Sequence, residues 1–386
     1  MNSRRSLFIC ACLGMLTFGI VLTVLGAVLP TVIERFGIDK AQAGSLFLLM
    51  TFGILAGSLV FGPMVDRYGY KGMLLLATIL IAIGLEGIAF ASSLALLRVA
   101  IALIGFGGGI INGGTNALVA DISSDGKSAS LNLLGVFFGI GAVGVPFALA
   151  TLSGSFSNRA LIGGVGALVV IPLLFIAATP FPAPKQAQGF PIAAAGRLTR
   201  DPLLLLLGFM LFVESGMEIT VGGWTSTFVN EELAVAQRTA LVVLSLYWLG
   251  MMLARLTLGT VLRNVPPVRA LYVCLSVGFI GSVTLLMTHN VSAAAVGVFM
   301  LGVGFAATFP AVLGLVGDRY AELSGTAFSL VIAMALCGGM LLPWLAGVLG
   351  GIYGMRGSFL IVPAALLVLA TLLGILPRRL RAKSTA

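Results

Sequence analysis

The chain has 386 residues, of which 59% are hydrophobic and only 9% are charged. An ordinary soluble domain carries about 25% charged residues, so this composition excludes a water-soluble fold. The net charge of +9 does not indicate nucleic acid binding, because the charges lie between long apolar runs.

Apolar runs of 18 or more residues recur along the chain, and each is long enough to cross a hydrocarbon core about 30 Å thick. The first run follows Arg4 and Arg5. It is longer than the apolar region of a signal peptide and no small-residue cleavage site follows it, so we interpret it as a membrane span. We therefore expect an all-α polytopic membrane protein with twelve transmembrane helices, in the ranges 7–33, 44–65, 71–91, 95–120, 129–153, 160–180, 202–229, 237–262, 268–288, 292–317, 325–349 and 357–377.

The longest hydrophilic break divides these spans into two sets of six. We expect an N-terminal six-helix bundle in 1–180, a cytoplasmic linker in 181–201 and a C-terminal six-helix bundle in 202–386. The termini and the gaps on their side hold 15 Lys and Arg residues, against 5 in the gaps on the other side. The positive-inside rule then places both termini in the cytoplasm, and we expect an integral protein of a bacterial inner membrane.

The chain also matches itself at a constant offset of 197 residues, without a gap across five spans. A glycine-rich chain gives some matches by chance, but Asp121 also coincides with Asp318 and Pro146 with Pro343. We interpret the match as a duplication that relates the two bundles by a pseudo-twofold axis along the membrane normal, which predicts a midplane binding site and rocking of the halves. The matched glycines are Gly19 and Gly216, Gly26 and Gly223, Gly53 and Gly250, Gly62 and Gly259, Gly84 and Gly281, Gly105 and Gly302, Gly107 and Gly304, and Gly141 and Gly338.

Three motifs resemble those of the major facilitator superfamily. The gap after the second span reads GPMVDRYGYK at 62–71, similar to the G-x-x-x-D-R-x-G-x-K motif of that family. Arg98 followed by the glycines of 105–109 resembles the pattern of its fourth span, and Pro146 in a glycine-rich fifth span resembles its proline-glycine motif. The resemblance covers essentially the whole chain and implies the two-bundle fold expected above.

Two further stretches resemble the fucose/glucose/galactose symporter branch, including its sodium-dependent glucose-transporter relatives. They read NGGTNALVA at 112–120 and EITVGGW at 218–224. The chain departs from the proton-coupled fucose permeases of that branch, because its first span carries no carboxylate before Glu34. The second-half counterpart of the motif, 259–269, lacks the aspartate, so the gate is expected to be asymmetric.

The resemblance implies a cytoplasmic gate around the first motif. Its expected members are Asp66, Arg67, Lys71, Asp121, Arg255 and Asp318. The aspartate of the motif would pair with basic residues in one state and release them in the other, and Arg255 would reach Asp318. The alternative is that these charges belong to a solvated loop.

Charges inside spans are costly and should face a partner or a watery cavity. Glu86 and Arg98 flank the short third gap at similar depth, so we expect a structural pair across a helical hairpin, with a direct substrate role as the alternative. Glu214 and Glu218 are four residues apart and share one face of the seventh span. Two carboxylates together in a low dielectric resist ionising at the same time, so the pair is expected to take up a proton or share a sodium ion. The alternative for either is pairing with a buried cation or hydrogen bonding across helices.

Asn112 and Asn116 are likewise four residues apart, on the span whose counterpart lines the cavity in the superfamily. Side-chain amides offer the donors and the acceptor that hydroxyl groups require, although amides also join helices in membranes. Three aromatic residues supply faces on which a sugar ring packs, or alternatively anchors at the membrane interface: Trp224, Tyr247 and Trp248. Thr17 and Asn132 are further cavity candidates by polar type and span number.

These residues favour a secondary transporter that moves a small polar solute, in the first place a sugar, by alternating access with proton or sodium coupling. The alternative is a proton-driven exporter of drugs or amphiphilic compounds, whose cavity would be mainly apolar with one acid. An intramembrane enzyme is disfavoured because the one histidine, His289, lies at a span edge and no nucleotide loop or metalloprotease motif is present; a sensor without transport is a remote possibility. We expect a monomer in membrane lipid with no cofactor, no metal and no nucleic acid partner, and core thiols at the four cysteines.

Overall fold

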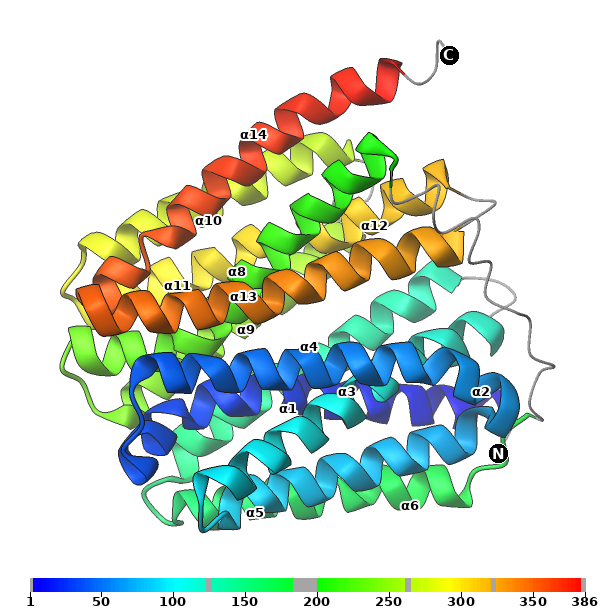
Figure 1. Cartoon of the computed structure of the whole chain (residues 1–386), viewed down its shortest axis with the longest axis horizontal. Helices are drawn as coiled ribbons and strands as arrows, with labels where there is room; N and C mark the ends of the chain where they lie inside the picture. Colours follow the sequence, from blue (N-terminus) through cyan, green and yellow to red (C-terminus); the bar gives the residue numbers. More distant parts are fainter. Residues whose placement is uncertain (1–2, 123–126, 183–199, 261–264, 321–323, 383–386) are drawn as a thin grey trace.

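A computed structural model describes residues 3–122, 127–182, 200–260, 265–320 and 324–382 (Figure 1). Within these ranges the chain is helical and forms no strand. The first half contains α1 (Ser3–Phe36), α2 (Lys40–Phe90), α3 (Leu94–Ile122), α4 (Lys127–Leu152), α5 (Asn158–Leu168) and α6 (Val170–Ala178). The second half contains α8 (Pro202–Glu232), α9 (Gln237–Thr260), α10 (Pro267–Met287), α11 (Val291–Phe305), α12 (Thr308–Arg319), α13 (Ser324–Ser358) and α14 (Ile361–Ala382).

The predicted spans correspond to these helices. Among the described residues, 11 helical segments are long and apolar enough to cross a membrane, and α14 adds the shorter apolar stretch Ile361–Leu376. The long helix α2 supplies two spans, Lys40–Gly62 and Arg67–Phe90, while α5 with α6 and α11 with α12 form one span each. The all-α fold with twelve spans is therefore confirmed. The predicted linker at 181–201 lies mostly outside the described residues.

Two glycines turn the chain between spans. Gly69 in α2 has φ 76° and Gly354 in α13 has φ 75°, in the left-handed region that glycine adopts without steric cost. Gly69 belongs to the motif at 62–71 and redirects the chain into the third span. The predicted end of the eleventh span at 349 is too early. Helix α13 extends past it to the turn at Gly354, and a short helical segment continues from that turn to Ser358.

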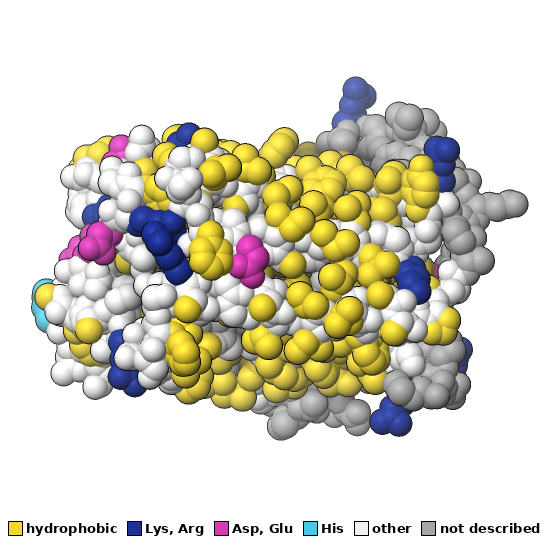
Figure 2. Space-filling model, turned by 90° about the horizontal axis from the view of Figure 1, so that it is seen from below, with side chains coloured by type: hydrophobic (Ala, Val, Ile, Leu, Met, Phe, Trp, Pro, Cys, Tyr) yellow, Lys and Arg dark blue, Asp and Glu magenta, His cyan; other side chains and the backbone are white. Residues whose placement is uncertain are grey.

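The surface between the ends of the molecule is apolar. Figure 2 shows hydrophobic side chains over the middle of one face, with several of the Lys and Arg side chains toward its ends. Exposed hydrophobic residues include Leu59, Ile83 and Leu174, at 61%, 54% and 64% exposure. Aliphatic side chains exposed to this degree over a contiguous band would be costly in water, so the band is the lipid-facing surface of an integral membrane protein.

The two halves lie side by side, with both chain termini at the same end of the molecule (Figure 1). We call this the terminal end and the other the opposite end. The halves meet where α2 packs against α13, α4 against α9 and α1 against α8. A shift of 197 residues places the first span of α2 on α9 and places α4 on α13. The contact between α2 and α13 is therefore the repeat equivalent of the contact between α9 and α4. This is the arrangement that a pseudo-twofold axis requires.

Close glycine contacts repeat the same symmetry within each half. A Cβ atom at Gly84 would lie 2.7 Å from the carbonyl oxygen of Ala100, and one at Gly281 would lie 2.6 Å from that of Gly297. Both residues of the second contact are displaced by 197 from the first. Three further pairs of contacts match in this way: Gly53 on Ala102 with Gly250 on Phe299, Gly105 on Met50 with Gly302 on Tyr247, and Gly107 on Ala77 with Gly304 on Cys274. Such approaches need glycine, so the duplication is present in the packing as well as in the sequence.

At the opposite end, equivalent backbone carbonyls in the two halves are bound by arginines that are not equivalent in the repeat. In the first half, Arg35 at the end of α1 donates to the carbonyl oxygens of Ala89 and Ala91, where the third span ends. The corresponding carbonyls in the second half, those of Leu286 and Thr288, accept instead from Arg356.

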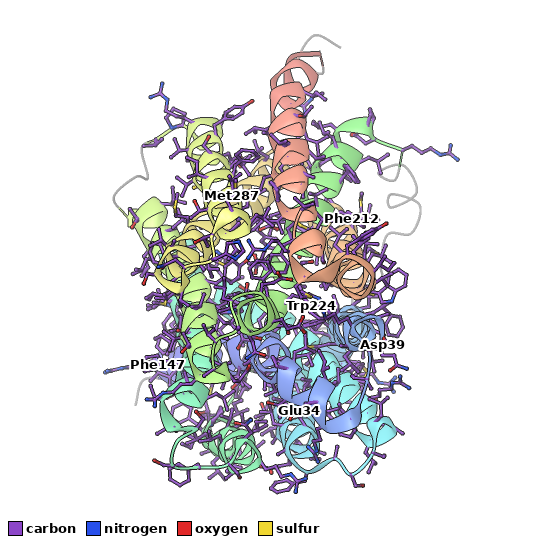
Figure 3. All side chains as sticks on the ribbon, turned by 90° about the vertical axis from the view of Figure 1, so that its left-hand side faces the viewer. Glu34, Asp39, Phe147, Phe212, Trp224 and Met287 are labelled. Carbon is purple, nitrogen blue, oxygen red and sulfur yellow. The ribbon has the colours of Figure 1, made fainter. Side chains whose placement is uncertain are left out.

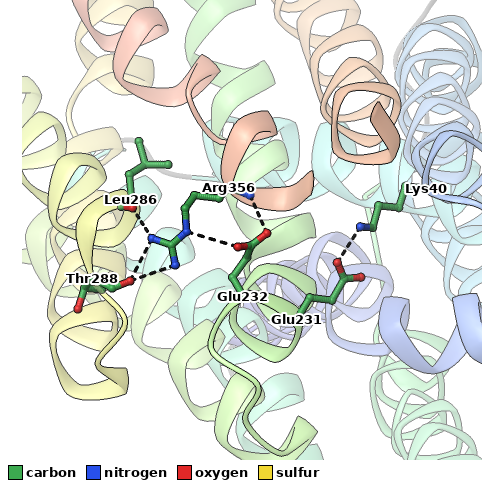
Figure 4. Close-up of polar contacts among 6 residues, drawn as sticks. All are labelled: Lys40, Glu231, Glu232, Leu286, Thr288 and Arg356. Atoms are coloured by element: carbon green, nitrogen blue, oxygen red, sulfur yellow. Dashed lines mark hydrogen bonds and ion pairs between the residues drawn. The ribbon is translucent and has the colours of Figure 1, made fainter. Parts of the chain in front are cut away.

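The exchange is explained by the residue at position 232. Glu232 stands where the repeat predicts the counterpart of Arg35, and Arg356 is the counterpart of Arg159. The Glu232 carboxylate accepts from the Arg356 backbone N–H at 3.1 Å and from its Nε at 3.4 Å (Figure 4). Glu232 therefore positions Arg356 beside the carbonyls of Leu286 and Thr288. In the first half, Arg35 stands at the position that corresponds to Glu232 and binds the corresponding carbonyls itself. Both solutions satisfy carbonyls at a helix C-terminus, which otherwise lack partners.

Candidate functional site

Two glutamates lie inside the most thoroughly buried helix, α8. This helix begins with a side-chain cap, in which Asp201 accepts from the backbone N–H of Leu203, and with Pro202 in its first turn. Glu214 is completely buried and Glu218 is 9% exposed. Their spacing of four residues places both on one side of the helix, as the sequence predicts.

Helix α9 supplies the cation that faces them. Arg255 Nη2 lies 3.3 Å from Glu218 Oε2, and the Tyr247 hydroxyl donates to the backbone carbonyl of Glu218 at 3.2 Å. The prediction that Arg255 reaches Asp318 is therefore wrong for this conformation. Because α9 packs against α8, the guanidinium finds a carboxylate inside the bundle, where leaving either charge unpaired is costly, whereas Asp318 is exposed at the end of α12.

Several polar atoms between α8 and α9 remain without a partner. Arg255 Nε and Trp248 Nε1 are buried and make no hydrogen bond within the described residues, and the buried Glu214 carboxylate has no partner there except the side chain of Glu218. Buried polar groups in native proteins are nearly always hydrogen-bonded. A group of unsatisfied donors and acceptors on two facing helices is thus a candidate for binding a solute or an ion.

The two asparagines on α3 are joined to each other. Asn116 Nδ2 donates to the Asn112 backbone carbonyl at 2.8 Å and to its Oδ1 at 3.2 Å, and it lies 3.9 Å from the sulfur of Met15. Both residues are half-buried. The Asn112 Nδ2 and the Asn116 Oδ1 have no partner among the described residues, so this pair retains one donor group and one acceptor.

The other predicted cavity residues are placed differently. The Thr17 hydroxyl is buried and donates to the Leu13 carbonyl at 2.9 Å within its own helix. Tyr247 and Trp248 are buried and pack edge to face, and Trp248 contacts Phe138 of the first half in the same geometry. The side chain of Asn132 lies outside the described residues.

Trp224 lies in the contact between the halves, as Figure 3 shows in a view onto the opposite end. Its indole is fully buried, Nε1 donates to the Pro343 carbonyl at 2.9 Å, and its ring lies 6.0 Å from that of Phe47. In this conformation the ring is therefore covered by protein and is not presented to a sugar.

Around Trp224 the halves are closed by glycines, which we call the glycine seal (Gly26, Gly44, Gly222, Gly223 and Gly347). A Cβ at Gly26 would overlap the carbonyl of Gly222 and lie 2.9 Å from Cα of Gly223, and one at Gly44 would lie 3.0 Å from the backbone of Trp344. Gly26 and Gly223 are counterparts in the repeat, and here they face each other across its axis. The sequence shows the pair but not that its members touch.

Polar contacts cross the halves beside the glycine seal. Ser226 donates to the Gly26 carbonyl at 2.6 Å, and Lys40 Nζ lies 2.7 Å from Glu231 Oε2 (Figure 4). Thr51, nearer the middle of α2, donates to the Gly339 carbonyl at 3.3 Å. Sequence reasoning missed the Lys40–Glu231 pair, because each residue alone reads as an ordinary loop charge.

Apart from Arg255, the predicted gate residues lie at the terminal end. Arg67, Asp121 and Asp318 are exposed and Lys71 is half-buried, while the side chain of Asp66 lies outside the described residues. The Tyr70 hydroxyl donates to Asp121 Oδ2 at 2.7 Å, so a tyrosine of the motif, absent from the prediction, contacts one expected latch partner. A Cβ at Gly62 would meet no atom within 4 Å, in contrast to the glycines of the seal.

The expected pair of Glu86 and Arg98 does not form. Among the described residues no ion pair joins them: Arg98 is exposed, and the Glu86 carboxylate lies against Gly163 and Gly166 of α5. The prediction considered only the two spans that the third gap connects. Helix α2 also packs against α5, where Gly163 and Gly166 leave room for the Glu86 side chain.

The fold and the paired halves define a polytopic transporter architecture, and comparison with known proteins agrees. The profile of the Major Facilitator Superfamily matches residues 7–322 and 229–386. The chain therefore belongs to the major facilitator superfamily, and it is a secondary transporter and not an enzyme.

Among its relatives are proteins named for sugars. The chain is 22% identical to sodium-dependent glucose transporter 1A of Mus musculus, over 88% of this chain and 88% of that protein. It is 22% identical to the glucose/mannose transporter GlcP of Bacillus subtilis, over 86% of this chain and 84% of that protein. A solved structure of a point mutant of the nucleoside transporter NupG superposes with a TM-score of 0.81 at 16% identity, over 97% of this chain and 100% of the other. The resemblance to the sugar symporter branch is thus confirmed, and the structural match shows the fold.

Proposed function

We propose that this transporter moves a small polar solute, in the first place a monosaccharide, by alternating access, with a coupling ion bound at Glu214 and Glu218. The observation that carries the solute assignment is the asparagine pair on α3, which retains the amide of Asn112 and the carbonyl of Asn116 for a ligand. A donor and an acceptor presented together match a hydroxyl group, which both accepts and donates.

Two further observations support a polar solute. The buried acids and Arg255 on the other half are unsuited to an amphiphile, since an apolar ligand would leave their unpaired atoms unsatisfied. The relatives named for glucose and mannose transport also cover most of this chain. The mouse relative is named as sodium-dependent, so both sodium and proton remain candidates for the coupling ion.

We also propose that both termini face the cytoplasm of a bacterial inner membrane, because Lys and Arg are concentrated on their side. The conformation closed at the opposite end is then closed toward the outside, and the terminal end corresponds to the cytoplasmic side. A monomer is sufficient for this mechanism, since the two halves of one chain carry both walls of the site.

Counterflow in proteoliposomes tests the solute class. Vesicles preloaded with one unlabelled monosaccharide at a time should accumulate the same labelled sugar transiently, and at least one member of a monosaccharide panel should do so. The measurement is repeated with and without sodium and at two pH values. Exchange of amphiphilic drugs in place of every sugar would reject the sugar assignment in favour of the exporter.

A further inference from the structure

We propose that Arg35 and Arg159 bind the phosphate group of an anionic phospholipid. The two arginines meet at the opposite end of the first half, where α1 ends and α5 begins. Helix α5 packs against α2, α4 and α6, so this phosphate site (Arg35, Arg159 and the first turn of α5) lies on the outer side of the first half. It is distinct from the proposed solute site on α3 and α8.

The second half shows an anion bound at the equivalent position. There the Glu232 carboxylate accepts from the backbone N–H of Arg356 at 3.1 Å and from its Nε at 3.4 Å (Figure 4). Arg356 is the repeat counterpart of Arg159, and Glu232 is the counterpart of Arg35. The backbone and side chain of the arginine thus bind a carboxylate, and in the second half the chain supplies that carboxylate itself.

In the first half the chain supplies no anion at this position. Arg35 stands in place of the glutamate, and neither Arg35 nor Arg159 makes an ion pair with any described residue. The backbone N–H of Arg159, in contrast to that of Arg356, has no acceptor among the described residues either. The first half therefore has two cations where the second half has a cation and an acid.

Hydrogen bonds between helices hold the two arginines near each other. Arg35 donates to two backbone carbonyls where the third span ends. At the start of α5, Asn158 donates to Thr31 Oγ1 at 3.1 Å, and Thr31 lies about one turn before Arg35 on α1. Arg159 is thereby placed close enough to Arg35 for the two positive charges to act on each other. An anion between them would turn this repulsion into attraction.

The acids closest in sequence or in packing do not neutralise the pair. Glu34 and Asp39 are exposed, and the Asp39 side chain caps α2. The Glu86 carboxylate lies deeper along α5, against Gly163 and Gly166. None of these three acids makes an ion pair with a described residue. The charge of the two arginines is thus left for a group from outside the chain.

The surroundings of the phosphate site favour a lipid over a soluble anion. Phe90 is 62% exposed and stands between the two residues whose carbonyls Arg35 binds, and Phe156, just before α5, is 56% exposed. Exposed aromatic side chains at the end of a membrane span lie at the level of the lipid headgroups. The planar guanidinium group matches the oxygens of a phosphate. An anionic headgroup fits better than a zwitterionic one, because the latter would add another cation.

The experiment titrates the purified protein in a neutral detergent with dioleoyl phosphatidylglycerol or dioleoyl phosphatidylcholine and counts bound lipid by native mass spectrometry. Wild type should prefer phosphatidylglycerol, and Arg159→Gln should weaken its binding about fivefold, the usual effect of one basic residue facing an anionic lipid. The matched control is Arg98→Gln. Arg98 is also an exposed arginine, near the start of α3 at the same end, and its loss should leave the preference unchanged.

A second variant separates lipid binding from folding. Arg35→Glu gives the first half the residue that the second half has at this position, so the new carboxylate should bind Arg159 as Glu232 binds Arg356. We expect this variant to keep the unfolding temperature of wild type in detergent without added lipid and to lose the preference for phosphatidylglycerol.

Three results would overturn the proposal. One is equal binding of the two lipids by wild type, and another is an unchanged preference in Arg159→Gln, whether or not Arg35→Glu folds. The third is displacement of phosphatidylglycerol by inorganic phosphate at the same ionic strength as a chloride control, which would show that the site takes a soluble anion.

Discussion

At the scale of single residues, the pairing of Glu218 with Arg255 determines what each acid on α8 can do. Both members are largely buried, with side-chain exposures of 11% and 28%. Removing one member of a buried ion pair leaves the other uncompensated, at a cost of about 3–5 kcal/mol, whereas removing both is far less costly. The two acids are therefore not independent, since any change at Glu218 releases the arginine next to Glu214.

The first prediction follows from this coupling. Arg255→Gln should lower the stability of the protein by about 3 kcal/mol, and Glu218→Gln with Arg255→Gln should recover part of that loss. Thermal unfolding in detergent measures both, with the exposed Arg67→Gln as a control that should change little. Equal destabilisation by the single and double variants would mean that the pair contributes nothing.

Coupled transport should respond to the same pair. Glu218→Gln frees Arg255 to bind Glu214 permanently as a carboxylate, so we expect this variant to lose accumulation against a gradient. Uptake against a solute gradient in proteoliposomes provides the measurement. Unchanged accumulation would remove Glu218 from the mechanism.

A third prediction concerns the asparagine pair. Asn116→Ala should weaken solute binding by about tenfold, because one hydrogen bond contributes about 0.5–1.5 kcal/mol, and it should leave the thermal stability nearly unchanged. The control is Asn158→Ala, which removes another inter-helix amide, bonded to Thr31 at 3.1 Å, far from the site in sequence. If Asn116→Ala alters stability and not affinity, the amide only joins helices.

At the scale of helices, the exchanged arginines allow a test of the duplication itself. Arg356→Ala removes the donor to the Leu286 and Thr288 carbonyls and should destabilise the protein by about 2 kcal/mol, within the range for hydrogen bonds to charged groups. Adding Glu232→Arg should restore stability, because an arginine at the repeat counterpart of Arg35 reaches the corresponding carbonyls in the first half.

Unfolding measured for Arg356→Ala with and without Glu232→Arg decides this prediction. Glu232→Arg alone serves as the control, since it places two arginines together as Arg35 and Arg159 are in the first half. A double variant no more stable than Arg356→Ala would show that the backbones of the two repeats differ here.

The helices also show how far sequence reasoning reaches. Hydropathy and the repeat predict the spans, the two halves and the glycine positions, because these depend on local composition and on matching residues. They do not predict which face of a helix meets which neighbour. For that reason three predicted partners differ from those in the structure. Glu86 was expected to pair with Arg98 but lies against the glycines of α5, and Arg255 was expected to reach Asp318 but pairs with Glu218. Trp224 was expected to contact the solute but donates to the Pro343 carbonyl.

At the scale of the whole molecule, the glycine seal sets which end is closed. A Cβ at Gly347 would overlap the Lys40 carbonyl and lie 2.8 Å from the Trp224 ring, whereas one at Gly351, a turn further along α13, would meet nothing within 4 Å. The two positions therefore form a matched pair on one helix, one inside the contact between the halves and one outside it.

A bulky residue at the first position should keep the opposite end from closing. We expect Gly347→Val to increase labelling of a cysteine placed at Thr51 by a membrane-impermeant thiol reagent from the opposite side, in a background without the native cysteines. Gly351→Val should label like the parent. Equal labelling in both variants would show that closure does not depend on this glycine.

The meeting of Gly26 with Gly222 and Gly223 has one more consequence. Peptide planes in van der Waals contact carry no ionisable group and no long side chain, so neither ionic strength nor mild acid alters their attraction. The attraction between these glycines should then persist across very different bathing solutions, whereas the neighbouring Lys40–Glu231 pair, which is partly exposed, should weaken as the ionic strength rises.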